Sequence, residues 1–476
     1  MSVSRRHFFY GTLLAGAVPT AGFGSSASLK HMGYQSPNEK LNIAAIGAGG
    51  KGRSDITGCA TENIVAMADP DALQARQMFT THEKAAKYTD FRKMLDKEER
   101  NIDAVIVSTP DFMHAAASLA AMEHGKHVYC QKPLTRTIWE ARALTAAAAK
   151  YNVATQMGNQ GYSNEGSRQC AEMIWSGAIG NVTEVHAWTN RPIWPQGLTA
   201  LPAPEKVPDT MEWDTWLGVA NERPYSKEYA PFKWRGWFDF GCGALGDMAC
   251  HILGAPNMAL MLGAPTSVEC IMQEGKSEFT FPKKSIIRFD FPARGAMPPV
   301  KIFWYDGMVA PPPRPSGIPD TELLGDLPRA TGSQPHQGQP IGEVFDPSKP
   351  IATTAPAPRP NGSLFVGDKG FLTTGTYGEN TRLVPVERMN DFKLPPALLT
   401  RSPGHYRDWI RAAKGGDPAC SNFSIAGPFT EWILLGVIAL RTEGKIEWDS
   451  AKMKITNNSE ANKLVKPFIR KGWKIG

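Results

Sequence analysis

Asp247 and His251 are the two residues of this sequence whose types and spacing most directly indicate proton-transfer chemistry. They follow a glycine-rich segment, 241–246, and lie four positions apart, so on a helix they share one face. A carboxylate in that position can orient an imidazole that takes up or releases a proton. The same spacing also gives purely structural hydrogen bonds, and the pair alone leaves both interpretations open.

A glycine loop predicts a second kind of chemistry, the binding of a dinucleotide. Gly47, Gly49 and Gly52 follow a continuous apolar run, 41–46, and precede a segment that can form a helix. In such a loop the first glycine permits a tight turn, the second lets the backbone approach a pyrophosphate, and the third lets helix and strand pack closely. The alternative is a glycine turn in an α/β domain that binds no nucleotide.

Asp69 indicates which dinucleotide the loop would bind. It ends the next apolar run, 63–68, at the distance from Gly47 where an acidic side chain holds the adenosine ribose hydroxyls. A carboxylate there repels a ribose 2′-phosphate, so the sequence favours NAD over NADP.

An alternation of strands and helices has to position these residues. Further strand-like runs at 102–108, 126–130 and 153–157 are separated by helical segments, including 138–150. Repeated βα units of this length predict a doubly wound parallel sheet, in which the ligand lies over the carboxyl ends of the strands. The further residues that we expect to bind the cofactor follow these strands: Thr109, Pro110, His114, Gln131, Lys132 and Asn159.

A second domain with a different pattern begins near residue 182. Alternating runs at 183–189, 267–272, 285–291 and 300–305 predict an open, mostly antiparallel sheet. Polar and aromatic residues gather between the first two runs and are candidates for sugar contacts, although they are equally typical of core or interface aromatics. The candidate substrate residues are Asn190, Arg191, Trp194, Tyr225 and Trp237.

The first residues predict export in a folded state. Arg5 and Arg6 precede a short apolar run that ends in small residues, which is typical of a twin-arginine signal peptide. The alternative is an uncleaved N-terminal anchor. Export of a folded protein lets a bound cofactor leave the cell, and we expect the protein to be periplasmic or otherwise exported. Outside, the cofactor meets no pool of free nicotinamide that would recycle it.

Composition narrows the remaining classes. The chain has 476 residues, is 42% hydrophobic and carries a net charge of +6, with its basic residues scattered and not gathered in a nucleic-acid-binding stripe. We therefore expect no nucleic-acid partner and no stable membrane span. The seven cysteines form no CxxC pair and no zinc pattern, which predicts no metal site and mostly buried free thiols.

Three of these motifs together resemble the glucose–fructose oxidoreductase/inositol dehydrogenase (Gfo/Idh/MocA) family. They are the glycine loop with Asp69, the segment Gln131-Lys132-Pro133, and the glycine-rich segment before Asp247 and His251. The resemblance implies a Rossmann domain paired with an α/β domain whose open sheet often forms the interface of a homo-oligomer. It places Lys132, Asp247 and His251 at the catalytic positions.

This resemblance suggests a division of the chain and draws attention to two departures. The expected parts are a signal peptide at 1–28, the NAD-binding domain at 38–160, the substrate and oligomerisation domain at 161–402 with a Pro-rich insertion at 310–360, and C-terminal helices and tail at 403–476. The family's usual Glu before the lysine is Gln131, which removes a charge beside Lys132. The Asp often found three residues after the histidine is Gly254.

The leading hypothesis is an exported NAD-dependent oxidoreductase that acts on a carbohydrate or polyol with a tightly bound cofactor. In it His251, oriented by Asp247, takes the hydroxyl proton, and Lys132 polarises the forming carbonyl. A second hypothesis, also implied by the resemblance, is a redox-neutral NAD-dependent glycoside hydrolase. It would oxidise the sugar transiently, eliminate the aglycone and reduce the sugar again. A third is a non-catalytic sugar-binding protein on the same fold.

Overall fold

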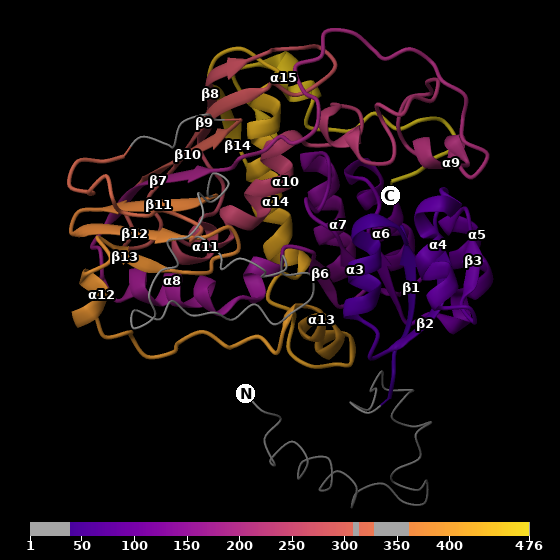
Figure 1. Ribbon diagram of the computed structural model, residues 1–476, viewed down its shortest axis with the longest axis horizontal. Helices are drawn as coiled ribbons and strands as arrows, with labels where there is room; N and C mark the ends of the chain where they lie inside the picture. Colours follow the sequence, from indigo (N-terminus) through magenta and orange to yellow (C-terminus); the bar gives the residue numbers. More distant parts are fainter. Residues whose placement is uncertain (1–38, 308–313, 328–360, 476) are drawn as a thin grey trace, which may run out of the picture.

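The computed structural model describes residues 39–307, 314–327 and 361–475. Two sheets lie side by side, each with helices packed against it (Figure 1). Helices α10 (Gly243–Ile252) and α14 (Phe423–Ala439) lie between them, and α14 contacts both helix α7 of the first domain and strand β8 of the second. The predicted signal peptide at 1–28 lies outside the described residues, as do 310–313 and 328–360 of the predicted insertion.

The first sheet is parallel, with strand order β3-β2-β1-β4-β5-β6. Its strands are β1 (Asn42–Ile46), β2 (Asn63–Ala68), β3 (Ala86–Tyr88), β4 (Ala104–Val107), β5 (His127–Cys130) and β6 (Thr155–Met157). Its helices are α3 (Gly50–Gly58), α4 (Ala72–Thr81), α5 (Phe91–Glu98), α6 (His114–Glu123) and α7 (Ile138–Lys150), with short turns η1 (Glu99–Asn101), η2 (Asp111–Met113) and η3 (Gln160–Ser163). This is the predicted Rossmann arrangement.

Helices cover both faces of this sheet, which is why its strands read as continuous apolar runs. Ile43 and Ala45 of β1 belong to the core beneath α3, α4 and α13 (His405–Ala413). Ala44 and Ile46 belong to the opposite core, together with α5, α6 and α7. Helix α7 begins with a capping box, because the Thr137 side chain and the residue three positions later bond each other's backbone N–H groups.

The second sheet is mixed, with strand order β13-β12-β11-β7-β10-β9-β8-β14-β15. Only the β7–β10 pair is parallel among its described strands, so the predicted open, mostly antiparallel sheet is confirmed. The strands are β7 (Val182–Trp188), β8 (Ser267–Glu274), β9 (Lys284–Phe291), β10 (Val300–Asp306), β11 (Gly362–Gly367), β12 (Gly370–Thr374), β13 (Arg382–Val384), β14 (Ile446–Asp449) and β15 (Lys454–Ile455). The helices of this part are α8 (Glu165–Trp175), α9 (Trp213–Leu217), α11 (Gly254–Ala259), α12 (Arg388–Asp391) and α15 (Ser459–Lys463), with the turn η4 (Lys233–Gly236).

Strand β9 illustrates how this sheet differs from the first. Its residues alternate between buried and half-buried, with Ile287 and Phe289 in the core and Arg288 on the other face. Phe289 packs edge-on against Trp432 of α14, with ring centroids 5.1 Å apart, whereas Arg288 pairs with Asp290 at 3.2 Å. This alternation is typical of an antiparallel sheet with one buried face.

The segment 403–476 is shared between the two domains and does not form a separate unit. Helix α13 packs on the first sheet, where Trp409 is fully buried, while β14 and β15 extend the second sheet. Helix α14 begins at Phe423, because the Asn422 side chain caps it by accepting the Ser424 N–H.

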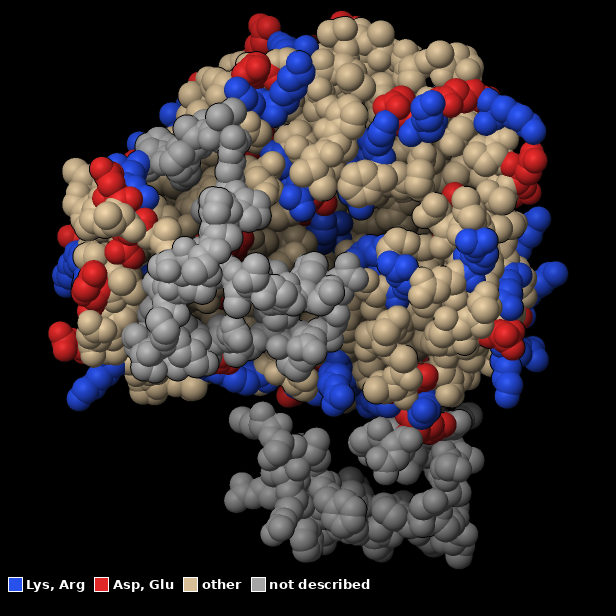
Figure 2. Space-filling view, viewed as in Figure 1, with Lys and Arg blue, Asp and Glu red and all other residues tan. Residues whose placement is uncertain are grey.

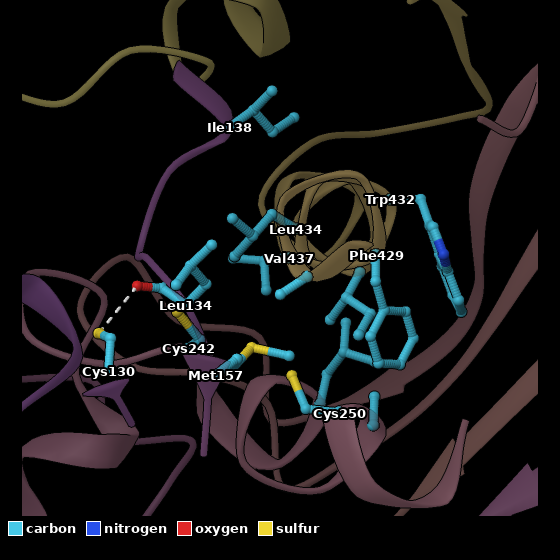
Figure 3. Packing of buried hydrophobic residues seen from close by; sticks show 14 of the residues in the cluster. Cys130, Leu134, Ile138, Met157, Cys242, Cys250, Phe429, Trp432, Leu434 and Val437 are labelled. Atoms are coloured by element: carbon cyan, nitrogen blue, oxygen red, sulfur yellow. Dashed lines mark hydrogen bonds between the residues drawn. The ribbon is translucent and has the colours of Figure 1, made fainter. Parts of the chain in front are cut away.

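Apolar packing beneath α14 fixes the backbone on either side of Lys132 and along helix α10 (Figure 3). Cys130 and Leu134, on either side of Lys132 in the sequence, are fully buried, and the Cys130 Sγ donates to the Leu134 carbonyl at 3.7 Å. Cys242 and Cys250, at the start and near the end of α10, belong to the same cluster. All seven cysteines are free thiols, and five of them are buried.

Two features are absent from the described residues. None of their helices combines the length and the apolar character that a membrane crossing needs. Nor do they contain a group of three or more His, Cys, Asp or Glu side chains arranged to hold a metal ion.

Candidate active site

A cleft lies between the two domains, over the carboxyl ends of the parallel strands, with a cavity volume of about 480 Å³. Figure 2 shows it as a hollow near the centre of the molecule, where blue Lys and Arg side chains gather. The first domain contributes the glycine loop and the strand ends, and the second contributes α10 and its neighbours. The lining residues include Gly47, Gly49, Lys51, Asp69, Ser108, Thr109, Pro110, Asp111, Gln131, Lys132, Arg191, Trp234, Arg235, Asp247, His251 and Tyr377.

Gly47, Gly49 and Gly52 of the glycine loop each stand where a side chain has no room. Gly47 has φ +86°, and a Cβ there would lie 2.6 Å from the Ser108 carbonyl oxygen. A Cβ on Gly52 would lie 2.0 Å from the carbonyl oxygen of Gly47, so this glycine permits close packing of helix on loop, and it does not line the cavity. A Cβ on Gly49 would meet Gln74 of α4 at 2.7 Å.

Asp69 holds the glycine loop as well as lining the cleft. One carboxylate oxygen accepts the N–H groups of Ala48 at 2.8 Å and Gly49 at 3.2 Å, and the other accepts that of Asp71 at 2.9 Å. Burial raises the pKa of Asp69 to about 6, against these hydrogen bonds. The side chain therefore remains mostly ionised at neutral pH, beside the loop that binds the nucleotide.

These residues fit a dinucleotide. The bare backbone of Gly47 and Gly49 borders the cavity at the N-terminus of α3, where the helix dipole favours a pyrophosphate. Asp69 and Asp71 line the adjoining part of the cavity, which suits ribose hydroxyls and not a ribose 2′-phosphate.

Lys132 and Asp247 form the central ion pair of the site. The Lys132 Nζ donates to the Asp247 Oδ1 at 2.8 Å and to the backbone carbonyl of the same residue at 2.9 Å. The Nε atoms of Arg191 and Arg235 lie 3.7 and 3.8 Å from the two carboxylate oxygens. Burial opposes ionisation, yet Lys132, Arg235 and Arg191 together lower the pKa of Asp247 to about 2. Asp247 is therefore a permanent carboxylate.

His251 lies one turn further along α10, as predicted, but Asp247 does not orient it. The Asp247 carboxylate bonds Lys132, and the buried His251 Nδ1 has no hydrogen-bond partner. The predicted Asp–His hydrogen bond is therefore wrong, because a lysine from the end of β5 takes the carboxylate. The His251 ring stands edge-on to Tyr377, with centroids 4.9 Å apart. Burial, and then Lys132, hold the pKa of His251 well below its ordinary value, so the ring is neutral at pH 7.

Gln131 bonds a buried acid that the sequence did not reveal. Its Nε2 donates to the Asp55 Oδ2 at 2.9 Å, and Asp55 is fully buried. Asp55 also accepts the Ser108 hydroxyl at 2.7 Å and, at 2.8 Å each, the Tyr406 hydroxyl and the Lys51 Nζ. Gln131 is uncharged where the family usually has Glu, but a carboxylate is still present beside it, that of Asp55 on α3. The Gln131 side chain donates a hydrogen bond to this carboxylate.

Among the other predicted cofactor residues, Thr109 and Pro110 line the cleft, whereas His114 and Asn159 do not. His114 is buried, with its ring nitrogens 2.7 Å from the Pro133 carbonyl and 2.9 Å from the Thr109 carbonyl, and it braces the two loops. Asn159 is fully buried and accepts the Ser421 hydroxyl at 2.6 Å. Both residues support the site from behind.

Among the five candidate substrate residues, only Arg191 lines the cavity. Asn190 supports it, because its Oδ1 accepts the Arg191 Nη1 at 2.7 Å. The prediction for the three aromatic residues is corrected, because Trp194, Tyr225 and Trp237 are buried in the core or its border and do not line the cleft.

Sequence reasoning missed several residues that do line the cavity around the Lys132–Asp247 pair. They are Asp111, Trp234, Arg235 and Tyr377. For Arg235 a signal was available, since it stands between two tryptophans in the segment Trp234-Arg235-Gly236-Trp237. Tyr377 follows a strand more than a hundred residues further on, and nothing in the sequence connects it to the site.

Asp111 predicts a pH effect on stability. Burial raises its pKa from 3.8 to about 7, although Lys132 and Arg235 oppose the shift, and its Oδ2 accepts the Cys242 N–H at 3.1 Å. The folded state therefore binds a proton that the unfolded state has already lost, so stability falls as pH rises between these values. In Asp111→Asn this loss is removed. We expect the melting temperature of the variant minus that of the parent protein to be larger at pH 8 than at pH 4. If scanning calorimetry gives the same dependence of melting temperature on pH for both proteins, the raised pKa of Asp111 is contradicted.

The fold and the cleft together define a class of protein, one that pairs an NAD-binding Rossmann domain with a second α/β domain. Comparison with protein families agrees. Residues 41–159 match the oxidoreductase family, NAD-binding Rossmann fold, and residues 173–274 match the oxidoreductase family, C-terminal alpha/beta domain, both of the Gfo/Idh/MocA group. Two parts of the chain thus match the two domain models of the Gfo/Idh/MocA oxidoreductases, and the first part is an NAD-binding Rossmann domain.

Individual relatives differ in their chemistry. Levoglucosan dehydrogenase of Pseudarthrobacter phenanthrenivorans is 25% identical over 230 residues, which are 45% of this chain and 50% of the relative. A glycosyl hydrolase family 109 protein of Solibacter usitatus is 29% identical over 177 residues, 34% of this chain and 39% of the relative. The chain therefore spans half or less of the length of these relatives.

Solved structures share the fold. The WlbA dehydrogenase of Bordetella pertussis, crystallised with NADH and UDP-GlcNAcA, has a TM-score of 0.57 at 14% identity. The match covers 86% of this chain and 99% of that one. At this identity the similarity concerns the fold, and it confirms the pairing of a Rossmann domain with a second α/β domain.

Proposed function

We propose that this protein is an oxidoreductase that transfers hydride between NAD and a hydroxyl-bearing carbon of a carbohydrate or polyol. The observation that supports it best is the Lys132–Asp247 pair beside a neutral His251, in the same cleft as the glycine loop. A lysine and an unprotonated imidazole can serve alcohol oxidation, one by polarising the oxygen and one by accepting its proton.

Each residue of this site has a separate task. His251 accepts the hydroxyl proton, because its ring lines the cleft and stays neutral. Lys132 holds the substrate oxygen and stabilises the charge that develops on it. Asp247 stays ionised and keeps Lys132 aimed across the cleft. Gly47, Gly49 and Asp69 would hold the dinucleotide, and NAD, when bound, supplies the hydride acceptor.

The experiment is to purify the protein, release and identify its bound nucleotide, and add a panel of sugars and polyols. We expect at least one of them to produce NADH in a stoichiometric amount, measured by nicotinamide absorbance. If no compound of the panel changes the redox state of the cofactor, the oxidoreductase function fails and a sugar-binding protein becomes the better account.

A second candidate is a redox-neutral glycoside hydrolase with tightly held NAD, favoured by the glycosyl hydrolase family 109 relative. Cleavage of an aryl glycoside without net NADH would support it, whereas stoichiometric NADH release counts against it. The twin-arginine pattern at Arg5 and Arg6 favours such a closed cycle, since an exported enzyme meets no free nicotinamide. Export, tight binding of the cofactor and a homo-oligomeric state stay predictions.

A further inference from the structure

The part of the cleft around Asp247 contains more positive than negative charge. Lys132, Arg191 and Arg235 all line it, and all three lie within 4 Å of one carboxylate, that of Asp247. Asp111 is the other acid there, and with a pKa of about 7 it adds at most part of a charge at neutral pH. At least one positive charge is therefore left over in a partly buried cavity.

The arginines keep hydrogen-bonding capacity that the protein does not use. Within the described chain the Arg191 guanidinium makes one hydrogen bond, from Nη1 to the Asn190 Oδ1 at 2.7 Å. The Arg235 guanidinium also makes one, from Nη1 to the Phe232 carbonyl at 3.1 Å. Their contacts with Asp247, at 3.7 and 3.8 Å, are longer than hydrogen bonds. Most of their N–H groups are thus available to a ligand.

Arg235 is also held in place by aromatic rings. Its guanidinium carbon lies 4.3 Å from the ring centroid of Trp234 and 4.6 Å from that of Phe232. A guanidinium fixed in this way loses little conformational freedom on binding, and its planar fork matches a carboxylate in two parallel hydrogen bonds. Because these partly buried side chains leave an excess of positive charge, the site is stabilised when it binds an anion.

We propose that the substrate is a sugar acid, whose carboxylate is bound by Arg191 and Arg235 while Lys132 and His251 face the hydroxyl that reacts. The three cations exceed Asp247 and a partly ionised Asp111 by between one and two charges, so charge alone admits a carboxylate or a phosphate, and the glucose 6-phosphate probe distinguishes the two. This proposal rests on the proposed function, whose site it extends by naming the substrate class.

The test measures binding to the NAD-loaded protein by quenching of tryptophan fluorescence. The probes are three hexuronates (glucuronate, galacturonate and mannuronate), their methyl esters, the corresponding neutral hexoses, and glucose 6-phosphate. We expect at least one hexuronate to bind more than tenfold tighter than its methyl ester, with an affinity that falls as salt rises. Arg191→Gln and Arg235→Gln should each weaken that hexuronate about tenfold and leave the methyl ester nearly unchanged. Arg100→Gln, which removes an exposed cation outside the cleft, is the matched control and should change neither.

The outcomes separate this proposal from the proposed function. Methyl esters or neutral hexoses that bind as tightly as every hexuronate overturn the sugar-acid proposal, as does a preference for glucose 6-phosphate. If, in that case, neutral sugars reduce the cofactor, the oxidoreductase function stands although the sugar-acid proposal fails. A hexuronate that binds through both arginines but never changes the redox state of the cofactor supports the anion site and overturns the oxidoreductase function.

Discussion

Replacing Lys132 by Met should lower kcat by about 10³-fold while the protein stays folded. The side chain of Lys132 lines the cleft, with its Nζ 2.8 Å from the Asp247 Oδ1. Methionine fills a similar volume but cannot hold the substrate oxygen or stabilise charge on it. Asp247 keeps two cations nearby, Arg191 and Arg235, so the variant does not leave a buried carboxylate without any partner. The measurement is kcat with the best substrate of the panel, beside a thermal melt.

Lys414→Met is the matched control for this variant. Lys414 pairs with Glu62 at 2.9 Å and is buried to a similar degree, with 12% of its side chain exposed against 15% for Lys132, but it does not line the cleft. Both variants lose an ion pair, and only Lys132→Met should lose activity beyond what its stability explains. Equal losses of activity in the two variants would show that Lys132 is structural.

Much of the first domain could be predicted because local pattern and tertiary position agree there. Strand β2 begins at Asn63 and ends at Ala68 as predicted, since a strand buried on both faces gives an uninterrupted apolar run. The glycine loop was equally legible, because Gly47 and Gly52 are required by backbone clashes that no other residue avoids. Strand β3 escaped prediction because it has only three residues, Ala86–Tyr88, none of them buried to the core.

The pairing of side chains within the site was harder to predict. Helical spacing placed Asp247 and His251 on one face correctly, but spacing describes only neighbours within an element. The lysine that takes Asp247 comes from the end of β5, 115 residues earlier. Asp55 was missed for the same reason, because its partners Gln131 and Tyr406 lie 76 and 351 residues away in the chain.

Aromatic residues gave the least reliable predictions. Trp194, Trp234 and Trp237 stand in similar sequence surroundings, yet only Trp234 lines the cleft. Trp237 is a core residue whose Nε1 donates to the Glu228 carbonyl at 2.8 Å. A tryptophan has both a large apolar surface and one donor, so its type suits a core as well as a sugar site, and only tertiary packing decides between them.

The second large effect is expected from Gln131→Glu, which should destabilise the folded protein by roughly 3–5 kcal/mol at pH 8. The substitution keeps the shape of the side chain but replaces its Nε2 donor with an acceptor, facing the Asp55 Oδ2 at 2.9 Å. Two acidic groups would then face each other in a buried site, and one of them must stay protonated or move. The free energy of unfolding, measured with urea, gives the size of the effect. The loss should shrink at pH 5, where the shared site binds a proton more readily.

The double variant Asp55→Asn, Gln131→Glu decides whether this pair is the cause. An amide at position 55 and a carboxyl at 131 restore one donor facing one acceptor. Tyr406 can still donate to the amide oxygen, whereas the Ser108 hydroxyl, which shares Oδ2 with Gln131, would turn to accept from the amide N–H. We therefore expect the double variant to be clearly more stable than Gln131→Glu alone, with a coupling energy of about 2 kcal/mol or more. Destabilisations that merely add in the double variant would mean that Gln131 and Asp55 do not interact. The presence of Gln in place of Glu at position 131 would then need another explanation.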